Sequence, residues 1–533
     1  MCQQEKPSGT DVCQRELPMN KFAGILNFPL ALGLLLLGGC DSSSGLDAPA
    51  PLSKQNINLV FVLSPDLTDS APGDVNQTTA NLTNQGLNRS LMMASYLRER
   101  VLGKQNVTGI YAVAPMTHLQ TANNLPDMAA MGAIQQFAML NQYTQPLLGS
   151  VTTATATAAN SFPLNVSYAA SAVLPSGVVT PYFGCPSCQG LDFANSGGVN
   201  DALLAGLVNA KASGFHVFSA PWVTTSAMLT RLNQLLGASL NLPSAYAGPN
   251  RVYAVSITPT DSASLTTFDA PLSPAASAPV LPAALAQTAC TAQPHKFSIS
   301  LTVGQPYSQT LDGVTRTGNV PAVLPAGINT QQTVYMIRHA EAHPSSSFEN
   351  GNFVAPGQWR ALGLADALRG KIKPDLVVSI DPAQVIPSGG SLASPYRYSY
   401  VRTTMTAEPY AIANNLPFYL VSDFSLMDIN FTNLQASASV IKANDYFFTD
   451  GAYAGKKVLM AWEHAHFPPT LNELLKRYFP NGGQPSIASN FWPEADYDTV
   501  WTVTLDAQGN LTADNALCEG IDTTTLPLAA PQF

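Results

Sequence analysis

The feature that most constrains the fold of this chain is a short apolar run that ends in a guanidinium and an imidazole. Val334 to Ile337 reads as a buried strand, and Arg338 and His339 follow it directly. In α/β folds, ligands bind beyond the carboxyl ends of the sheet strands. The sequence therefore predicts an α/β fold in which this pair stands at a ligand-binding edge.

Arginine and histidine side by side favour phosphoryl chemistry. The planar guanidinium binds phosphate oxygens and keeps its charge, and histidine can act as a nucleophile near neutral pH. Two adjacent residues also occur together by chance, so two later segments matter more. Residues 401–411, VRTTMTAEPYA, carry Arg402, and a second apolar run, Val458 to Ala461, leads to Glu463 and His464.

The three segments, in this order, resemble the histidine phosphatase superfamily over roughly residues 332–510. In that family the first histidine takes the phosphoryl group, which implies His339 as the nucleophile. The resemblance also implies that Arg338, Arg402 and His464 line the phosphate pocket. It implies hydrolysis of a small phosphorylated substrate through a phosphohistidine, with no metal and no cofactor.

Other positions place the chain within that superfamily. Residues 357–370, GQWRALGLADALRG, have helical spacing of apolar residues and fit the helix between the first two family segments. Ala340 stands where the family usually has glycine. Ala342 and Ala465 stand where the acid phosphatase and phytase branch has an arginine and an aspartate. The chain is therefore more similar to the mutase-like branch, and phytase activity is not expected.

A carboxylic acid must protonate the leaving oxygen, and the sequence leaves two candidates. Asp428 lies where mutase-like relatives carry a donor glutamate and is the first choice, and Glu341 is the second. Glu463 either orients a pocket group or caps the strand end. His464 and His466 form an H-x-H pattern, but carboxylate partners at ligand spacing are absent, so no metal is expected.

Residues 57–265 contain segments that resemble those around the Arg338–His339 motif and follow in the same order, which predicts an internal repeat of domain size. Ser64 and Pro65 take the places of the motif arginine and histidine, His118 lies near the second arginine, and Val223 replaces the second histidine. We therefore expect two tandem histidine-phosphatase-like α/β domains, each a mostly parallel central sheet flanked by helices, with the first copy inactive. The alternative is a match between generic strand and helix patterns. In the second sheet, the strands that end at Ile337 and Ala461 are expected to be neighbours.

This reading divides the chain into five parts. An upstream segment and signal peptide occupy residues 1–39, with Met19 as the expected start, and a tether covers 40–55. The degenerate domain is expected over 56–267 and the catalytic domain over 332–533. Between them, a Pro/Ala-rich linker spans 268–331, within which residues 296–330 are expected to form a hairpin.

The start of the chain resembles a bacterial lipoprotein signal. Lys21 precedes an apolar stretch that runs to Leu37, and Gly38-Gly39-Cys40 completes a lipobox, so Cys40 would carry the lipid. The alternatives are a plain signal peptide or a single membrane span. The lipoprotein hypothesis places the protein in the bacterial cell envelope, facing the periplasm.

Charge and cysteine content agree with an exported protein. The 533 residues carry a net charge of −9 and only 11% are charged, which argues against a nucleic-acid partner. Five cysteines follow the expected start at Met19, and four remain once Cys40 is assigned to the lipid; in an oxidising compartment they allow three pairings. We favour Cys185–Cys188 and Cys290–Cys518.

The expected function is an envelope-tethered phosphatase that acts on a phosphomonoester. One alternative is a lipoprotein without enzymatic activity that binds a phosphorylated or other ligand at the cell envelope. The other is a phosphomutase or phosphotransferase. The sequence does not select the natural substrate or the oligomeric state.

Overall fold

The computed structural model describes residues 48–69, 73–141, 161–169, 171–179, 190–343, 349–387, 397–424 and 438–533. The chain divides into Met1–Asp47 and a compact unit, Ala48–Phe533. The predicted signal peptide with Cys40, the predicted Cys185–Cys188 bridge and the candidate donor Asp428 lie outside the described residues. Within the described part, no helix is long and apolar enough to span a membrane.

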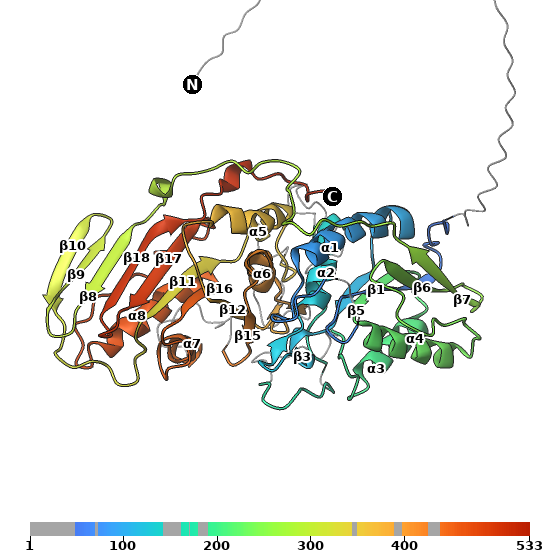
Figure 1. Cartoon of the computed structure of the whole chain (residues 1–533), viewed down its shortest axis with the longest axis horizontal. Helices are drawn as coiled ribbons and strands as arrows, with labels where there is room; N and C mark the ends of the chain where they lie inside the picture. The colour runs from blue at the N-terminus through green and yellow to red at the C-terminus, as the bar shows by residue number, and fades with distance from the viewer. Residues whose placement is uncertain are drawn as a thin grey trace, which may run out of the picture. The chain divides into compact units, whose positions relative to one another are not determined.

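The compact unit contains two β-sheets with helices packed against them, which makes a mixed α/β structure (Figure 1). The first sheet has the strand order β2-β5-β1-β6-β7. All seven residues of β1 are buried, because helices cover both faces of the central strand. Its strands are β1 (Ile57–Leu63), β2 (Gly109–Ala112), β5 (Gly214–Ala220), β6 (Arg251–Ile257) and β7 (Ala263–Asp269).

The second sheet has nine strands in the order β10-β9-β8-β18-β17-β11-β16-β12-β15. Four neighbouring strands, from β11 to β15 in that order, run parallel, and the remaining pairs are antiparallel. The strands are β8 (Phe297–Leu301), β9 (Pro306–Leu311), β10 (Val314–Asn319), β11 (Gln332–Arg338), β12 (Leu376–Ile380), β15 (Phe418–Val421), β16 (Lys457–Trp462), β17 (Thr499–Leu505) and β18 (Leu511–Cys518).

The two sheets share one topology around their first strand. β1 pairs in parallel with β5 and antiparallel with β6, and β11 pairs in the same way with β16 and β17. Beyond these, β5 continues to β2 as β16 continues to β12, and β6 continues to β7 as β17 continues to β18. Each sheet is therefore mixed, with its parallel strands gathered on one side of the first strand.

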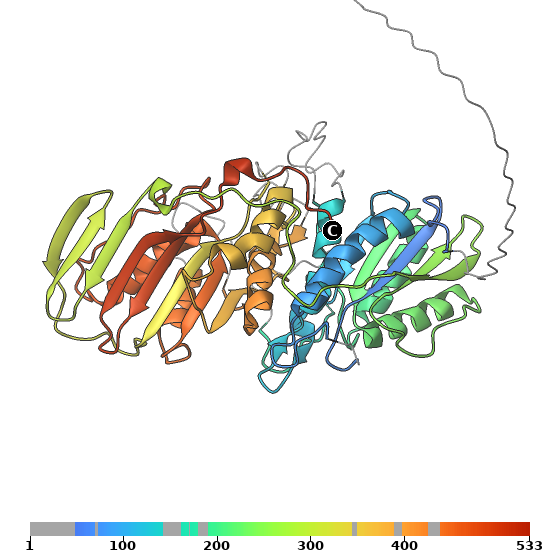
Figure 2. The same cartoon turned by 45° about the horizontal axis from the view of Figure 1, so that its top comes forward.

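The helices pack in matching pairs. α1 contacts α2 in the first half, and α5 contacts α6 in the second. All twelve residues of α2 are buried, because this helix lies between the first sheet and helices α5 and α6 (Figure 2). The helices are α1 (Asn84–Tyr96), α2 (Ala129–Leu140), α3 (Val199–Ala210), α4 (Trp222–Leu236), α5 (Ala355–Ala367), α6 (Arg402–Asn414), α7 (Ala438–Phe448) and α8 (Phe467–Arg477).

Shorter elements fill the connections. A π-helical turn, η1, extends α1, and the 3₁₀ turns η2, η3, η7 and η8 lie in loops. Two small ribbons pair β3 with β4 and β13 with β14. Their bounds are η1 (Leu97–Val101), η2 (Pro115–Thr117), η3 (Cys290–Ala292), η7 (His464–His466), η8 (Thr523–Thr525), β3 (Leu119–Gln120), β4 (Leu125–Pro126), β13 (Val385–Pro387) and β14 (Arg397–Ser399).

The segment expected to contain a hairpin forms three antiparallel strands instead. β8, β9 and β10 pair in sequence, and β8 also pairs with β18, so they extend the second sheet. Phe297, Ile299 and Leu301 are buried while the serines between them are exposed, as a half-buried strand requires. The sequence predicted only a two-stranded hairpin because five of the six residues of β10 are exposed and this strand shows no alternation of apolar and polar residues.

A disulfide joins Cys290 in η3 to Cys518 at the end of β18. This pairing was predicted by matching the cysteines that remained after Cys40 and the CxxC pair were assigned. The bridge ties the long segment that precedes β8 to a strand in the interior of the second sheet.

Candidate active site

The candidate site lies at the carboxyl ends of β11 and β16. These strands are parallel neighbours, with Ile337 opposite Ala461, as the sequence predicted. Arg338 is the last residue of β11 and His339 follows it. Glu463 and His464 follow β16 directly. Because parallel strands end at the same edge of a sheet, the two motif segments meet there.

The third segment reaches this edge through α6, which begins at Arg402. Thr406, one turn into α6, accepts a hydrogen bond from the backbone N–H of Ala340 at 2.8 Å. The same hydroxyl donates to the carbonyl of Arg402 at 2.7 Å. The start of α6 is thereby fixed to the loop that carries His339.

His339 is almost fully buried, and both of its ring nitrogens face oxygen atoms. Nδ1 lies 2.7 Å from the carbonyl oxygen of Ala340, and Nε2 lies 2.9 Å from Oε2 of Glu463. Both partners are acceptors, so both nitrogens donate in the protonated ring; in a neutral ring whose proton stays on Nδ1, facing the carbonyl, the lone pair is on Nε2.

The Glu463 carboxylate contacts three residues: His339, Tyr400 and His464. Its Oε2 accepts a hydrogen bond from the hydroxyl of Tyr400 at 2.7 Å. Its Oε1 accepts from the backbone N–H of His464 at 3.0 Å and also contacts Nδ1 of that histidine. The Glu463 carboxylate thus occupies the place beside Nε2 of His339.

Both predicted arginines lie near His339, each stacked on a tyrosine. The guanidinium of Arg338 lies 4.0 Å from the ring centroid of Tyr497, and that of Arg402 lies 4.5 Å from the ring centroid of Tyr400. Both rings pack edge-on against His339, with centroids 6.0 and 6.3 Å from the imidazole. Arg338, His339, Arg402 and His464 thus converge on one place.

The Nη1 group of each arginine is hydrogen-bonded, whereas its Nε–H donor has no acceptor among the described residues. Arg338 donates to the backbone carbonyls of Glu494 and Asp496, and Arg402 donates to Glu349 Oε2 at 2.6 Å. In both guanidinium groups the Nε atom is buried and has no hydrogen-bond partner among the described residues. Two buried cationic N–H donors without acceptors are what an anion such as phosphate requires.

Burial and charge set the protonation of the site. Burial lowers the pKa of His339 to about 4, and the charges of Arg402 and Arg338 act in the same direction. Burial alone would raise the pKa of Glu463, but His339 and His464 hold it well below its usual range. Glu463 is therefore ionised at neutral pH, and burial of His339 works against the charged form that this carboxylate favours.

Glu349, Tyr400 and Tyr497 were not identified from the sequence. Burial would raise the pKa of Glu349, but the charge of Arg402 outweighs it and lowers that pKa. Burial raises the pKa of Tyr400 well above its usual range, so this residue stays a hydrogen-bond donor. Glutamate is scarce in this chain, so the position of Glu349 between two motif segments was the one signal in the sequence that could have identified it as a site residue.

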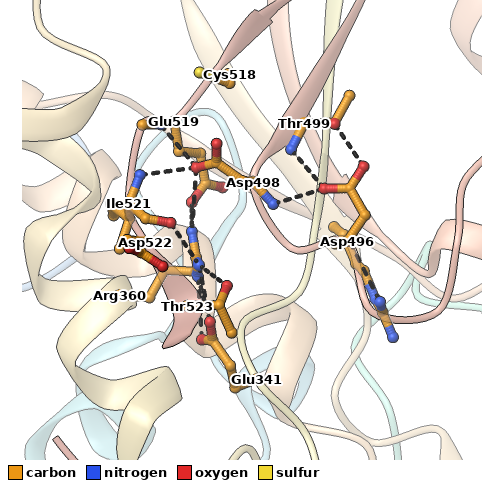
Figure 3. Close-up of polar contacts among 12 residues, drawn as sticks. Glu341, Arg360, Asp496, Asp498, Thr499, Cys518, Glu519, Ile521, Asp522 and Thr523 are labelled. Atoms are coloured by element: carbon orange, nitrogen blue, oxygen red, sulfur yellow. Dashed lines mark hydrogen bonds and ion pairs between the residues drawn. The ribbon is translucent and has the colours of Figure 1, made fainter. Parts of the chain in front are cut away.

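Glu341, the second candidate proton donor, belongs to a different cluster (Figure 3). Its carboxylate accepts from Nε of Arg360, a fully buried residue of α5, at 2.9 and 3.1 Å. Arg360 also contacts Glu519, which accepts from Nη1 at 2.5 Å, and the hydroxyl of Thr523. This arginine, not the site around His339, engages the Glu341 carboxylate.

The remaining motif histidines make other contacts. Nε2 of His343 lies 3.0 Å from the hydroxyl of Ser161, and burial lowers the pKa of His343 to about 4. His466 is fully buried and stacks on Trp462, with ring centroids 4.7 Å apart. His466 therefore belongs to the core beneath the strand end.

No family model matches the chain, and no curated protein does. Solved structures similar to part of it include "Mycobacterial hydrolase 2", at 15% identity over 37% of this chain and 95% of that one, with a TM-score of 0.23. A phosphoserine phosphatase of Entamoeba histolytica in complex with phosphoserine matches at 13% identity over 34% of this chain and 96% of its own, with a TM-score of 0.22.

A mycobacterial glucosyl-3-phosphoglycerate phosphatase with inorganic phosphate matches at 14% identity over 32% of this chain and 89% of its own, with a TM-score of 0.19. Several of the solved structures similar to this chain are thus phosphatases. Similarities at these TM-scores do not assign the chain to a family.

Proposed function

We propose that this protein is a phosphatase of the histidine phosphatase type, which hydrolyses a small phosphomonoester through a phosphohistidine. The observation that carries the proposal is the convergence of His339 with two arginines whose buried Nε–H donors lack acceptors. A transferring phosphoryl group spreads negative charge over its equatorial oxygens, and preorganised cationic donors stabilise that charge.

In the proposed reaction, Nε2 of His339 attacks phosphorus and the bond to the leaving oxygen breaks. The lone pair of Nε2 is available because Nδ1 carries the proton, and the low pKa of His339 keeps the ring neutral. Asp428 remains our candidate for the acid that protonates the leaving oxygen. Water then cleaves the phosphohistidine, which releases inorganic phosphate and restores the imidazole.

Glu463 has to leave the Nε2 side of His339 before a phosphate can enter. Nε2 and Oε2 hydrogen-bond only when a proton lies between them, so the contact weakens in the neutral form that attacks. The carboxylate already bridges His339, His464 and Tyr400. We infer that the entering phosphate takes over these donors from Glu463.

We also propose that the first half is a degenerate tandem copy of the second. In each half one acidic residue, Asp74 or Glu341, ion-pairs with an arginine of the following helix, Arg89 or Arg360. The carbonyl of that acidic residue also accepts a backbone hydrogen bond at 2.9 Å, from Thr83 or from Val354.

The same carbonyl lies against a helix glycine, Gly86 or Gly357, three residues before the arginine. A Cβ on either glycine would lie 3.0 Å or less from that carbonyl oxygen. Generic helix and strand patterns do not predict such a repeated set of contacts. Together with the shared strand topology, it supports duplication.

The test is turnover of an aryl phosphate by the purified full chain. His339→Ala should abolish turnover because it removes the nucleophile. Arg402→Ala should lower it by a hundredfold to a thousandfold, or about 3 kcal/mol of transition-state stabilisation. Turnover should survive EDTA, because no metal takes part in the reaction.

The matched control is His295→Ala, which removes a half-exposed histidine that pairs with Asp312 outside the site. This variant should retain activity. Wild-type activity in His339→Ala would exclude the phosphohistidine mechanism. If the wild type binds phosphate but turns over no phosphomonoester, the result would favour the alternative hypothesis of a ligand-binding lipoprotein without enzymatic activity.

A further inference from the structure

Asp66, His118 and Asp127 form a second polar cluster, in the first half of the compact unit. One ligand atom from each lies within 4.8 Å of the other two, and this is the one such group among the described residues. Asp66 lies three residues beyond the end of β1, His118 follows η2, and Asp127 lies two residues before α2. The cluster thus lies at the carboxyl end of the first sheet, as the phosphatase site does in the second.

Hydrogen bonds hold all three side chains and leave one carboxylate oxygen without a partner. Oδ2 of Asp66 lies 2.7 Å from Nε2 of His118, and Oδ1 accepts from the backbone N–H and the hydroxyl of Thr68. Asp127 Oδ1 accepts from the backbone N–H of Ala129 at 3.0 Å. Asp127 Oδ2 is fully buried and has no hydrogen-bond partner in the described part of the chain.

A second buried carboxyl group lies near the cluster. Burial raises the pKa of Asp127 to about 7, and burial together with the charge of Asp127 raises the pKa of Glu408, a buried residue of α6, well above its usual range. Oε1 of Glu408 also lacks a partner in the described structure, and burial and the charge of Asp66 raise the pKa of Asp69 in the same loop. Buried carboxylates are normally paired with a cation or coordinate a metal ion.

We propose that Asp66, His118 and Asp127 bind one divalent transition-metal ion of the zinc or manganese class. One imidazole nitrogen and two carboxylate oxygens are donors that such ions prefer. Ligand atoms in a tetrahedral zinc site lie about 3.3 Å apart, so small side-chain rotations close the present spacing. Three protein ligands leave at least one position for water or a bound molecule.

The ring of His118 is already oriented for this role. It stacks on Phe193, with centroids 3.5 Å apart and planes inclined by 11°, and Nε2 faces the two carboxylates. The His118 side chain is 11% exposed whereas that of Asp66 is fully buried, so the ion enters past His118. The first half would thus bind a cation at the edge of its sheet that corresponds to the candidate site of the second half, and this inference does not depend on the phosphatase proposal.

The experiment titrates the untagged, metal-stripped full chain with Zn²⁺, Mn²⁺ and Co²⁺ by calorimetry, with visible absorption as the second readout for Co²⁺. We expect one ion per chain and a rise in melting temperature with the ion that binds. Asp127→Asn should weaken binding at least about a hundredfold and remove the thermal shift. It neutralises an unpaired buried carboxylate and keeps its shape, so the variant should fold.

His118→Ala should abolish binding, and His295→Ala is the matched control because it breaks an exposed His–Asp pair that lacks a third carboxylate. The control should bind as the wild type does. The proposal is overturned if no ion binds to the wild type, or if Asp127→Asn and His118→Ala bind as tightly as the wild type. If neither variant folds, sulfur coordination in the wild-type Co²⁺ spectrum would overturn it, and a spectrum of nitrogen and oxygen ligands would support it.

Discussion

At the residue scale, Glu463 is the side chain in the candidate site that a phosphate-binding pocket would not be expected to contain. Its charge lies beside Nε2 of His339, where an incoming phosphate would also be negative. Glu463→Gln removes this charge and keeps the size of the side chain. The inhibition constant for inorganic phosphate should therefore fall about tenfold, because like charges at this distance repel.

Glu99→Gln is the control for that measurement, because Glu99 is exposed and pairs only with Lys104 among the described residues. Its phosphate inhibition should equal that of the wild type. Weaker phosphate inhibition in Glu463→Gln would mean that Glu463 assists binding, for example by orienting His464.

The acid limit of activity is the second prediction at this scale. His339 attacks only when neutral, and burial lowers its pKa from 6.5 to about 4. Activity should therefore persist well below pH 6.5 and fall as the pH drops through about 4. The measurement is kcat/KM against pH, corrected for ionisation of the substrate. An acid limb near 6.5 would show that His339 titrates as an exposed imidazole.

At the element scale, the disulfide joins two elements separated by 228 residues in sequence. It restricts the unfolded chain and anchors η3 to the end of β18. Cys290→Ala should lower the free energy of unfolding by about 2–5 kcal/mol. Urea unfolding of the full chain measures the loss.

Cys518→Ala and the double variant provide the check, because both break the same bond. All three should lose nearly the same stability, since the second substitution removes nothing further. Wild-type stability in Cys290→Ala, or additive losses in the double variant, would show that the bridge does not form in the oxidised protein.

At the scale of the whole molecule, we propose that a lipid on Cys40 tethers the protein to the cell envelope. Cys40→Ser should move the protein from the membrane fraction to the soluble fraction, because the serine cannot carry the thioether-linked lipid. Cys290→Ser should remain in the membrane fraction, as the control for loss of a cysteine. Lipid found by mass spectrometry on Cys40→Ser would refute the lipoprotein hypothesis.

The two halves also meet through polar side chains within the compact unit. Gln135 of α2 donates to Asn352 at 2.9 Å, and Tyr168 donates to Asp381 at 2.8 Å. Such buried hydrogen bonds are costly to leave unmade, so they specify one packing of the halves. Although the first half lacks the motif residues, it thus packs against the segments around the candidate site.

The sequence by itself determined the strands that carry the motif residues, because buried strands leave a local apolar signal and the residues that follow them are read directly. It also predicted β11 and β16 as neighbours and favoured the Cys290–Cys518 bridge among three possible pairings, and the structure contains both. Only the tertiary structure placed Glu463 against His339 and turned Glu341 toward Arg360.

The grouping of Asp66, His118 and Asp127 was likewise decided by the tertiary structure. These contacts join residues from separate elements, and their geometry depends on how helices and loops pack at the sheet edge. Local periodicity has no information on that packing, so side chains beyond the motif could not be assigned in advance. Because only 11% of the residues are charged, the composition narrowed the choice of candidate site residues, but it could not show which side chains those residues contact.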